Sequence, residues 1–265
     1  MAAESVIYER KGNIGIITLN RPERLNAITD DLLSNLIKQL NAVREDEEVA
    51  SVILTGKGKS FCSGEDLKET AMGKDFRQWI KETHWLQETE RTILKLNKPL
   101  IAAIRGYAIG GGLEFALSCD IRIAAQDAKF GFPETGVGLT VACAATKLMA
   151  QVVGLGKAKE LIFTGEIIDA DEAFRIGLVN KVVPAESLLD EALKMCGEIG
   201  EKSPLSLSLS RIAIDQGLHS SFEQILEIEA AHLLTCVGSG SEEEFVQRKL
   251  AEMEKKKKKE IRGEG

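Results

Sequence analysis

A run of three glycines followed closely by a glutamate is the most informative chemical pattern in this sequence. Residues 106–115 read GYAIGGGLEF, and Glu114 stands three positions after Gly111. Glycine costs conformational entropy wherever it is placed, so consecutive glycines need a reason in the backbone. Without a Cβ, Gly111 lets a ligand oxygen reach the unpaired N–H groups at the start of a helix. Such groups bind phosphate or stabilise an oxyanion that develops during a reaction.

The glutamate favours the oxyanion over the phosphate. A carboxylate beside a phosphate would be repelled, whereas beside a neutral carbonyl group it can act as an acid or a base. For this stretch alone, the simpler interpretation is a tight helix–strand contact that needs small residues. Glu114 would then be a solvated residue of the first helical turn.

Two further stretches add chemistry of the same kind. SFCSGEDLKE at 60–69 follows a predicted strand and holds an exposed glycine turn. FGFPETGVGL at 130–139 places Glu134 after a proline, in a loop bounded by glycine. Two carboxyl groups of different protonation state can act as the acid and the base on one substrate.

Together with ITLNRPERLNAI at 17–28, these stretches closely resemble the enoyl-CoA hydratase/isomerase (crotonase) family. The resemblance extends from about residue 5 to 235 and includes TGEIIDADEAFRIGLVNKVVP at 164–184. It implies an α/β protein with a crotonase-like fold, in which a repeated ββα spiral core carries the CoA site and the active site. The core is expected over 1–200. A helical C-terminal trimerisation region over 201–265 is expected to pack on the core and on neighbouring subunits.

The resemblance also implies roles for individual residues. The family polarises an acyl-CoA thioester between two backbone N–H groups, which correspond to Glu65 and Gly111. Only the main chain of Glu65 would be used, so its side chain need not interfere if it points outward. Two glutamates that hold a water in family hydratases correspond to Glu114 and Glu134. Contacts with the CoA moiety are implied for Arg24, Ala27, Cys62, Ser63, Gly64, Asp66, Leu67 and Lys68.

We therefore predict an enoyl-CoA hydratase, a lyase of fatty acid metabolism that adds water across the 2,3 double bond of an enoyl-CoA thioester. Coenzyme A would be part of the substrate, with no separate cofactor and no metal. A double-bond isomerase of the same family remains an alternative. So does a hydratase of a cyclic or dienoyl acyl-CoA, because AATKLM at 144–149 replaces the Gly-Gly-Thr-Gln-Arg-Leu-like run usual in the family. From another class, a non-catalytic family member could bind RNA through its lysine-rich end.

The elements that must position these residues follow from hydrophobic periodicity. Short β-branched or apolar runs predict strands at 14–19, 49–54, 99–104 and 120–125. Thr29 opens a helix, and its apolar face carries Leu32, Leu33, Leu36, Ile37 and Leu40. A second helix is predicted roughly over 76–96. From about residue 140 the pattern is mostly helical, which favours one strand-rich region followed by helices over two independent domains.

The C-terminal segment from about 241 is charged, and its few apolar anchors are Phe245, Val246, Leu250 and Met253. Such a helix would not fold alone and must dock on another surface. The family resemblance implies a homotrimer or a dimer of trimers. The lysine run at 255–259 is either a solvated helix end or a contact with a CoA phosphate across a subunit boundary.

Composition excludes several other classes of protein. The 265 residues carry a net charge of −7, which argues against general binding to nucleic acid or an anionic membrane. The apolar stretches are too short to cross a bilayer, and MAAESVIYER lacks the features of a signal peptide. The five scattered cysteines form no C-x-x-C pair, which fits free thiols in a reducing cytoplasm. We find no phosphate loop, dinucleotide fingerprint, G-x-S-x-G elbow or histidine spacing typical of a metal site.

Overall fold

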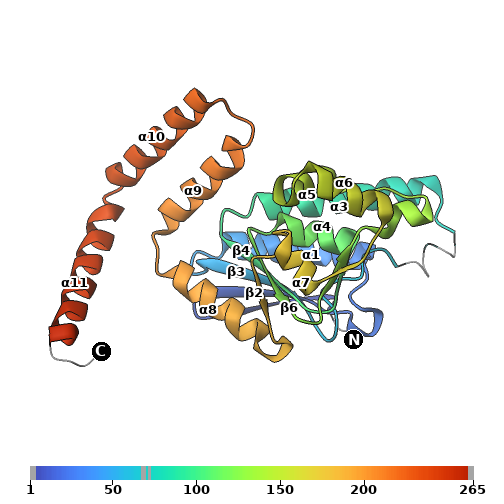
Figure 1. Cartoon of the computed structure of the whole chain (residues 1–265), viewed down its shortest axis with the longest axis horizontal. Helices are drawn as coiled ribbons and strands as arrows, with labels where there is room; N and C mark the ends of the chain where they lie inside the picture. Colours follow the sequence, from blue (N-terminus) through green and yellow to red (C-terminus); the bar gives the residue numbers. More distant parts are fainter. Residues whose placement is uncertain (1–3, 67–69, 71–72, 262–265) are drawn as a thin grey trace. The chain divides into compact units, whose positions relative to one another are not determined.

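The computed structural model describes residues 4–66, 70 and 73–261. Strands and helices alternate in the first part of the chain, and helices predominate in the rest (Figure 1). Contacts within the chain divide it into two compact units, Met1–Ile199 and Gly200–Gly265. All the predicted site residues lie in the first unit.

A mainly parallel sheet forms the centre of the first unit. Among the described residues its spatial order is β1-β2-β3-β4-β6-β9. Only β1 and β2 are antiparallel, while every other neighbouring pair is parallel. The bounds are Val6–Lys11, Ile14–Leu19, Ser51–Gly56, Leu100–Ile104, Ile121–Ala125 and Lys181–Val183. A smaller sheet has the order β5-β7-β8, with bounds Tyr107–Ile109, Lys129–Gly131 and Ile168–Asp169.

The main sheet is buried on both faces, as parallel sheets require. Successive residues of β3 point to opposite faces, so that Val52 and Leu54 enter one apolar cluster and Ile53 enters another. The larger cluster also contains residues of α1 (Asp30–Glu45), α3 (Phe76–Leu94) and α4 (Gly111–Ser118). The smaller cluster is covered by α8 (Leu188–Gly200).

Helix α1 begins where its sequence pattern indicates. The hydroxyl oxygen of Thr29 accepts a hydrogen bond from the Leu32 N–H at 3.2 Å, which satisfies one unpaired donor of the first turn. Its buried face comprises Leu32, Leu33, Leu36, Leu40 and Val43, and Ile37 is half-buried. The strand predicted over 49–54 begins instead at Ser51, because the Ala50 N–H bonds the Asn13 carbonyl in the connection before the register starts.

Shorter elements complete the first unit around the predicted site. Helices α5, α6 and α7 span Ala145–Val153, Leu155–Thr164 and Ala170–Arg175. Three short 3-10 turns, η1, η2 and η3, span Pro22–Arg24, Pro133–Val137 and Ala185–Ser187. The first two turns carry the predicted residues Arg24 and Glu134.

The second unit consists of helices that leave much apolar surface uncovered. Helix α9 (Pro204–Gly217) packs against α10 (Phe222–Gly238), and α10 also contacts α11 (Ser241–Ile261). Leu233 and Leu234 of α10 are 65% and 69% exposed. Val246, Leu250 and Met253 of α11 are about half exposed. Across the described part of the chain, no helix has the length and apolar character needed to span a membrane.

Candidate active site

The site is built on three backbone segments that hydrogen-bond to one another. The Cys62 N–H donates to the Tyr107 carbonyl at 2.9 Å, and the Ile109 N–H donates back to the Cys62 carbonyl at 3.0 Å. On the other side, the Ile28 N–H donates to the Gly64 carbonyl at 2.8 Å. These bonds bring the predicted donors, Glu65 and Gly111, into one small region.

Close approach of these segments explains the glycines that the sequence places there. Gly64 has a φ of +79°, and a Cβ on it would lie 2.6 Å from the Ile109 carbonyl oxygen. A Cβ on Gly112 would overlap the Cys62 carbonyl. Gly112 therefore serves the tight backbone contact that the sequence offered as one explanation for the glycines. That contact also places Gly111 beside a cavity.

Both predicted donor residues border that cavity, which has a volume of about 300 Å³. Gly111 is the first residue of α4, where the N–H has no acceptor within the helix. The short pairing of Ile28 with Glu65 uses the Gly64 carbonyl, so the Glu65 N–H points away from Ile28. The cavity is lined by Ile28, Glu65, Trp79, Glu82, Thr83, Leu86, Gly111, Glu114, Glu134, Leu139, Thr140 and Ala142.

Glu114 is buried and held by backbone donors. Its side chain accepts hydrogen bonds from the N–H groups of Cys143 at 2.7 Å, Ala145 at 3.4 Å and Ala142 at 3.5 Å. These donors lie at and just before the start of α5, where the helix dipole favours negative charge. Burial nevertheless raises the pKa of Glu114, because desolvation outweighs the three donors.

Glu134 occupies a different environment on the same cavity. Within the described residues, its Oε2 atom is buried without a hydrogen-bond partner. Burial raises the pKa of Glu134 to about 7, and the nearby Glu114 adds to this rise, while the Glu134 N–H acts in the opposite sense. The two glutamates therefore combine one carboxyl group fixed by backbone donors with one whose pKa lies near neutral pH and whose second oxygen has no partner in the described residues.

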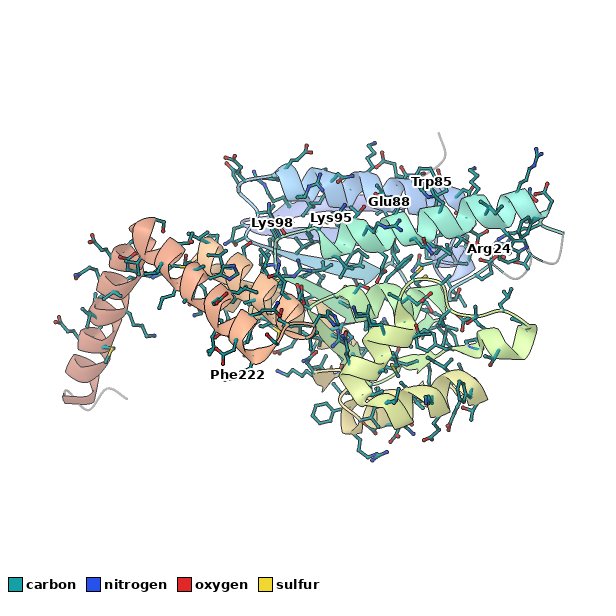
Figure 2. All side chains as sticks on the ribbon, turned by 90° about the horizontal axis from the view of Figure 1, so that it is seen from above. Arg24, Trp85, Glu88, Lys95, Lys98 and Phe222 are labelled. Carbon is teal, nitrogen blue, oxygen red and sulfur yellow. The ribbon has the colours of Figure 1, made fainter. Side chains whose placement is uncertain are left out.

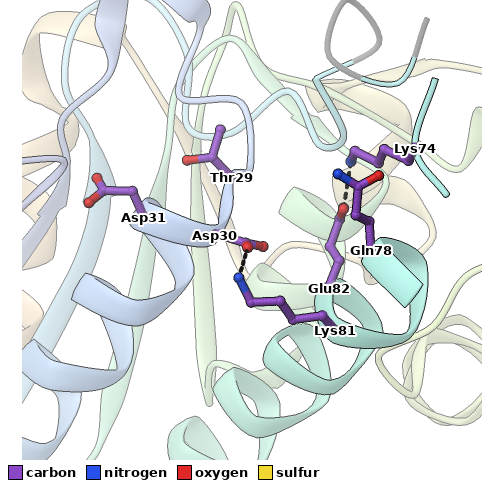
Figure 3. Close-up of a pocket in the computed structure, with 7 residues that line it drawn as sticks. All are labelled: Thr29, Asp30, Asp31, Lys74, Gln78, Lys81 and Glu82. Carbon is purple, nitrogen blue, oxygen red and sulfur yellow. Dashed lines mark hydrogen bonds and ion pairs between the residues drawn. The ribbon is translucent and has the colours of Figure 1, made fainter. Parts of the chain in front are cut away.

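The side chain of Glu65 does not extend freely into solvent. Its carboxylate pairs with Lys74 and accepts a hydrogen bond from Thr70 at 2.5 Å. Lys74 also bonds Glu82 at 2.5 Å (Figure 3). One ammonium group therefore joins two carboxyl groups. Burial raises the pKa of Glu82 to about 7, and its hydrogen bond with Glu65 adds to the rise. Partial burial opposes ionisation of Glu65, but the hydrogen bonds with Glu82, Lys74 and Thr70 together lower its pKa.

The residues predicted to contact CoA lie along the same segments. Arg24 is exposed, at the end of the unit where α3 begins (Figure 2). Ala27 is buried, and its carbonyl accepts a bond from the Arg21 guanidinium at 2.6 Å. Cys62 and Asp66 are also buried, whereas Ser63 is half-buried. Leu67 and Lys68 lie outside the described residues.

Ala142, not the alanine pair 144–145, lines the cavity. Ala144 adopts a φ of +66°, a left-handed conformation that costs a non-glycine residue about 1–2 kcal/mol. Ala145 is fully buried, and its N–H bonds Glu114. The replacement of the usual glycines therefore acts on the backbone that holds Glu114.

Sequence reasoning missed three residues that shape the site. Asn26 has a φ of +55°, and its amide bonds the carbonyls of Lys57 at 3.1 Å and Ser60 at 2.7 Å, tying two loops together. Its signal is the preference of asparagine for left-handed turns. Glu82 and Glu90 stand four residues on either side of Leu86 on α3, a spacing that places all three on one face. The signal available in the sequence was an acidic residue at helical positions that share a face with an apolar residue.

Comparison with known proteins identifies the family. The model of the family described as enoyl-CoA hydratase/isomerase matches residues 9–258. The chain belongs to this family. A crotonyl-CoA hydratase of Syntrophomonas wolfei is 39% identical over 92% of this chain and 94% of its own length. A short-chain-enoyl-CoA hydratase of Clostridium acetobutylicum is 40% identical over 89% of this chain and 90% of its own.

Solved structures agree with this assignment. An enoyl-CoA hydratase from Bacillus anthracis superposes with a TM-score of 0.86 at 34% identity, covering 88% of this chain and 91% of its own. The α/β crotonase fold predicted from the sequence is confirmed, and so is the family resemblance.

The Gly111 donor can be tested with a matched pair of variants. Gly111→Pro removes the N–H at a helix position that accepts proline, whereas Gly111→Ala keeps the N–H and adds a Cβ that meets the mobile end of Ile28 at 2.7 Å. We expect kcat for crotonyl-CoA hydration to be about 10²–10³-fold lower in the proline variant than in the alanine variant. Circular dichroism should show both folded. Equal activities would remove the Gly111 N–H from the site.

Glu90 predicts a distinctive dependence of stability on pH. It is 4% exposed, is hydrogen-bonded to Ser118, and has a buried Oε2 without a partner in the described residues. Burial, with Glu114 adding to it, raises its pKa from about 4.5 to about 9. Because the folded pKa is raised, its stabilising contribution is complete below pH 4.5 and is lost as the pH rises toward 9.

Glu90→Gln removes this titration while keeping the shape of the side chain. The Tm of the variant relative to wild type should therefore rise between pH 5 and pH 8.5, by about 3 °C or more. Glu88→Gln, which changes an exposed carboxylate on the same helix, should show no such trend. A Tm difference for Glu90→Gln that stays constant with pH would contradict the buried neutral acid.

Proposed function

We propose that the chain catalyses the addition of water across the 2,3 double bond of an enoyl-CoA thioester, as a hydro-lyase. The observation that carries this proposal is the convergence of Glu114, Glu134 and the donor positions Glu65 and Gly111 on one cavity. The names of the relatives from Syntrophomonas wolfei and Clostridium acetobutylicum support the same reaction class.

The oxyanion hole would act on the thioester carbonyl. When water attacks C3, negative charge moves through C2 to the thioester oxygen. The N–H groups of Glu65 and Gly111 would stabilise that oxygen more strongly as its charge grows. Donors held by the rigid backbone contact between 62–65 and 107–112 need no rearrangement during the reaction, which is the condition for effective electrostatic stabilisation.

The two glutamates would divide the proton transfers. Glu114, facing three backbone donors, is the better carboxylate and would take a proton from water as its oxygen attacks C3. Glu134, with a pKa near 7 and an unpartnered oxygen, is the better acid and would deliver a proton to C2. The reaction then consumes one water and leaves the 3-hydroxyacyl thioester.

Coenzyme A enters this scheme only as part of the substrate, and we propose no separate cofactor. The loops at 24–27 and 62–66 are the proposed CoA contacts, held together by the Asn26 side chain. We further propose a cytoplasmic location. The five cysteines are free thiols, four of them buried, which suits a reducing compartment.

We also propose that the protein assembles as a homotrimer or a dimer of trimers. The second unit exposes apolar side chains on α10 and α11, more than an isolated helical unit normally leaves in water. Burying them against other copies of the chain would account for their exposure.

Replacing each catalytic glutamate by glutamine tests the hydratase mechanism. Glu114→Gln and Glu134→Gln keep the side-chain volume but remove the titration, so each should lower hydration by about 10²–10⁴-fold. The double variant should be little worse than the poorer single variant, because groups that act as a unit are not additive.

The same variants distinguish a hydratase from an isomerase. A hydratase incorporates labelled oxygen from water into the 3-hydroxyacyl product. An isomerase would move the double bond of a 3-enoyl-CoA without incorporating oxygen, and Glu134→Gln would then be silent. Rapid isomerisation without label in the wild-type enzyme would defeat the hydratase proposal.

The assembly can be measured by light scattering coupled to size exclusion. Wild type should have the mass of three or six chains at micromolar concentration. Leu233→Glu places a charge on the exposed apolar face of α10 and should shift the mass toward the monomer. Glu227→Gln, on the same helix, should not. A monomeric wild type would refute the proposed assembly.

A further inference from the structure

Glu82 stands in the wall between two neighbouring cavities of the first unit. One is the candidate active-site cavity of about 300 Å³. The other, of about 320 Å³, lies between the starts of α1 and α3 and is lined by Thr29, Asp30, Asp31, Lys74, Gln78, Lys81 and Glu82 (Figure 3). The Glu82 side chain is only 8% exposed, so this partition is a nearly buried carboxyl group.

Lys74 holds that carboxyl group in place. Its ammonium lies 2.5 Å from Glu82 Oε2, pairs with Glu65, and sits 4.9 Å from the centre of the Trp79 ring. The lysine side chain is 14% exposed. Ion pairs with so little access to water are costly to uncover or displace, because each charge would lose its partner.

The orientation of the substrate follows from the proposed function, on which this inference rests. The thioester oxygen lies at the Glu65 and Gly111 donors, and the double bond lies beside Glu114 and Glu134. The remaining lining of the cavity is supplied by Ile28, by Leu139, Thr140 and Ala142, and by Trp79, Glu82, Thr83 and Leu86 of α3. The acyl group beyond C3 must therefore extend along a wall that contains the Glu82 carboxyl group.

We propose that Glu82, held by Lys74, is a specificity-determining residue that restricts the acyl cavity to short enoyl groups. A crotonyl group ends soon after C3 and leaves the pair of Lys74 and Glu82 undisturbed. A longer alkyl chain must lie against the carboxyl group and remove its remaining hydration, which is unfavourable for an apolar ligand. Each added methylene would gain about fourfold in affinity against an apolar wall, and that gain is lost here.

Removing the charge should therefore extend the chain-length range. In Glu82→Leu, Lys74 still pairs with Glu65, so no buried charge is left without a partner. Glu82→Gln keeps the volume and removes the ionisable carboxyl group. Glu88→Leu on the same helix is the matched control, because Glu88 is exposed and lies outside both cavities (Figure 2).

Binding of saturated acyl-CoAs tests this without requiring turnover. Isothermal titration with butyryl-CoA and octanoyl-CoA gives a ratio of affinities for each variant. In wild type, octanoyl-CoA should bind no more than about threefold tighter than butyryl-CoA. The ratio should rise in favour of octanoyl-CoA by at least tenfold in Glu82→Leu, by a smaller factor above threefold in Glu82→Gln, and not at all in Glu88→Leu.

Hydration of 2-enoyl-CoAs of four, six and eight carbons should follow the same order in kcat/KM. Wild-type preference for octanoyl-CoA by tenfold or more, or an unchanged ratio in both Glu82 variants, would overturn the inference. A shifted binding ratio in an enzyme that hydrates none of these thioesters would instead refute the proposed function while supporting the role of Glu82 in acyl selection.

Discussion

The backbone contact between 62–64 and 107–112 is the constraint on which the rest of the site depends. Two hydrogen bonds through Cys62 hold the segments together, and glycines at 64 and 112 let them approach. This contact fixes the start of α4, which determines where the Gly111 N–H and the Glu114 side chain point. Because both belong to one helical turn, the Gly111 N–H and the Glu114 carboxyl group cannot move independently.

Burial of carboxyl groups around the cavity is the main energetic cost of this arrangement. The cost of burying Glu114 is offset by backbone donors at the start of α5, and the cost of burying Glu82 is offset by Lys74. Among the described residues the Glu90 carboxyl group bonds only Ser118, and burial raises its pKa to about 9. Glu134 keeps an unpartnered oxygen toward the cavity within the described chain. The poorly compensated groups are thus either neutral or placed where a substrate can bond them.

The sequence predicted the local elements and the family, but not how side chains share charge. The cap at Thr29 and the apolar face of α1 carry strong short-range signals, and the structure places them accordingly. The glycine–glutamate pattern at 111–114 became informative only together with the other stretches that resemble the family. Lys74 can pair with both Glu65 and Glu82 because the residues at the start of α3 lie beside the turn that contains Glu65. No periodicity encodes that approach. The bond from Cys143 to Glu114 likewise joins residues 29 positions apart.

The side chain of Glu65 connects the proposed thioester-binding end of the cavity to the part of its wall that contains Glu82. A donor that uses only its N–H places no demand on its side chain, so glutamate is chemically acceptable there. Its charge, however, needs a partner in a half-buried position, and Lys74 supplies it. Lys74 in turn reaches Glu82, whose pKa rises to about 7 because burial and Glu65 disfavour a second full negative charge. A change at residue 65 would therefore alter the charge on the cavity wall at Glu82, although the proposed mechanism assigns the two positions to different parts of the substrate.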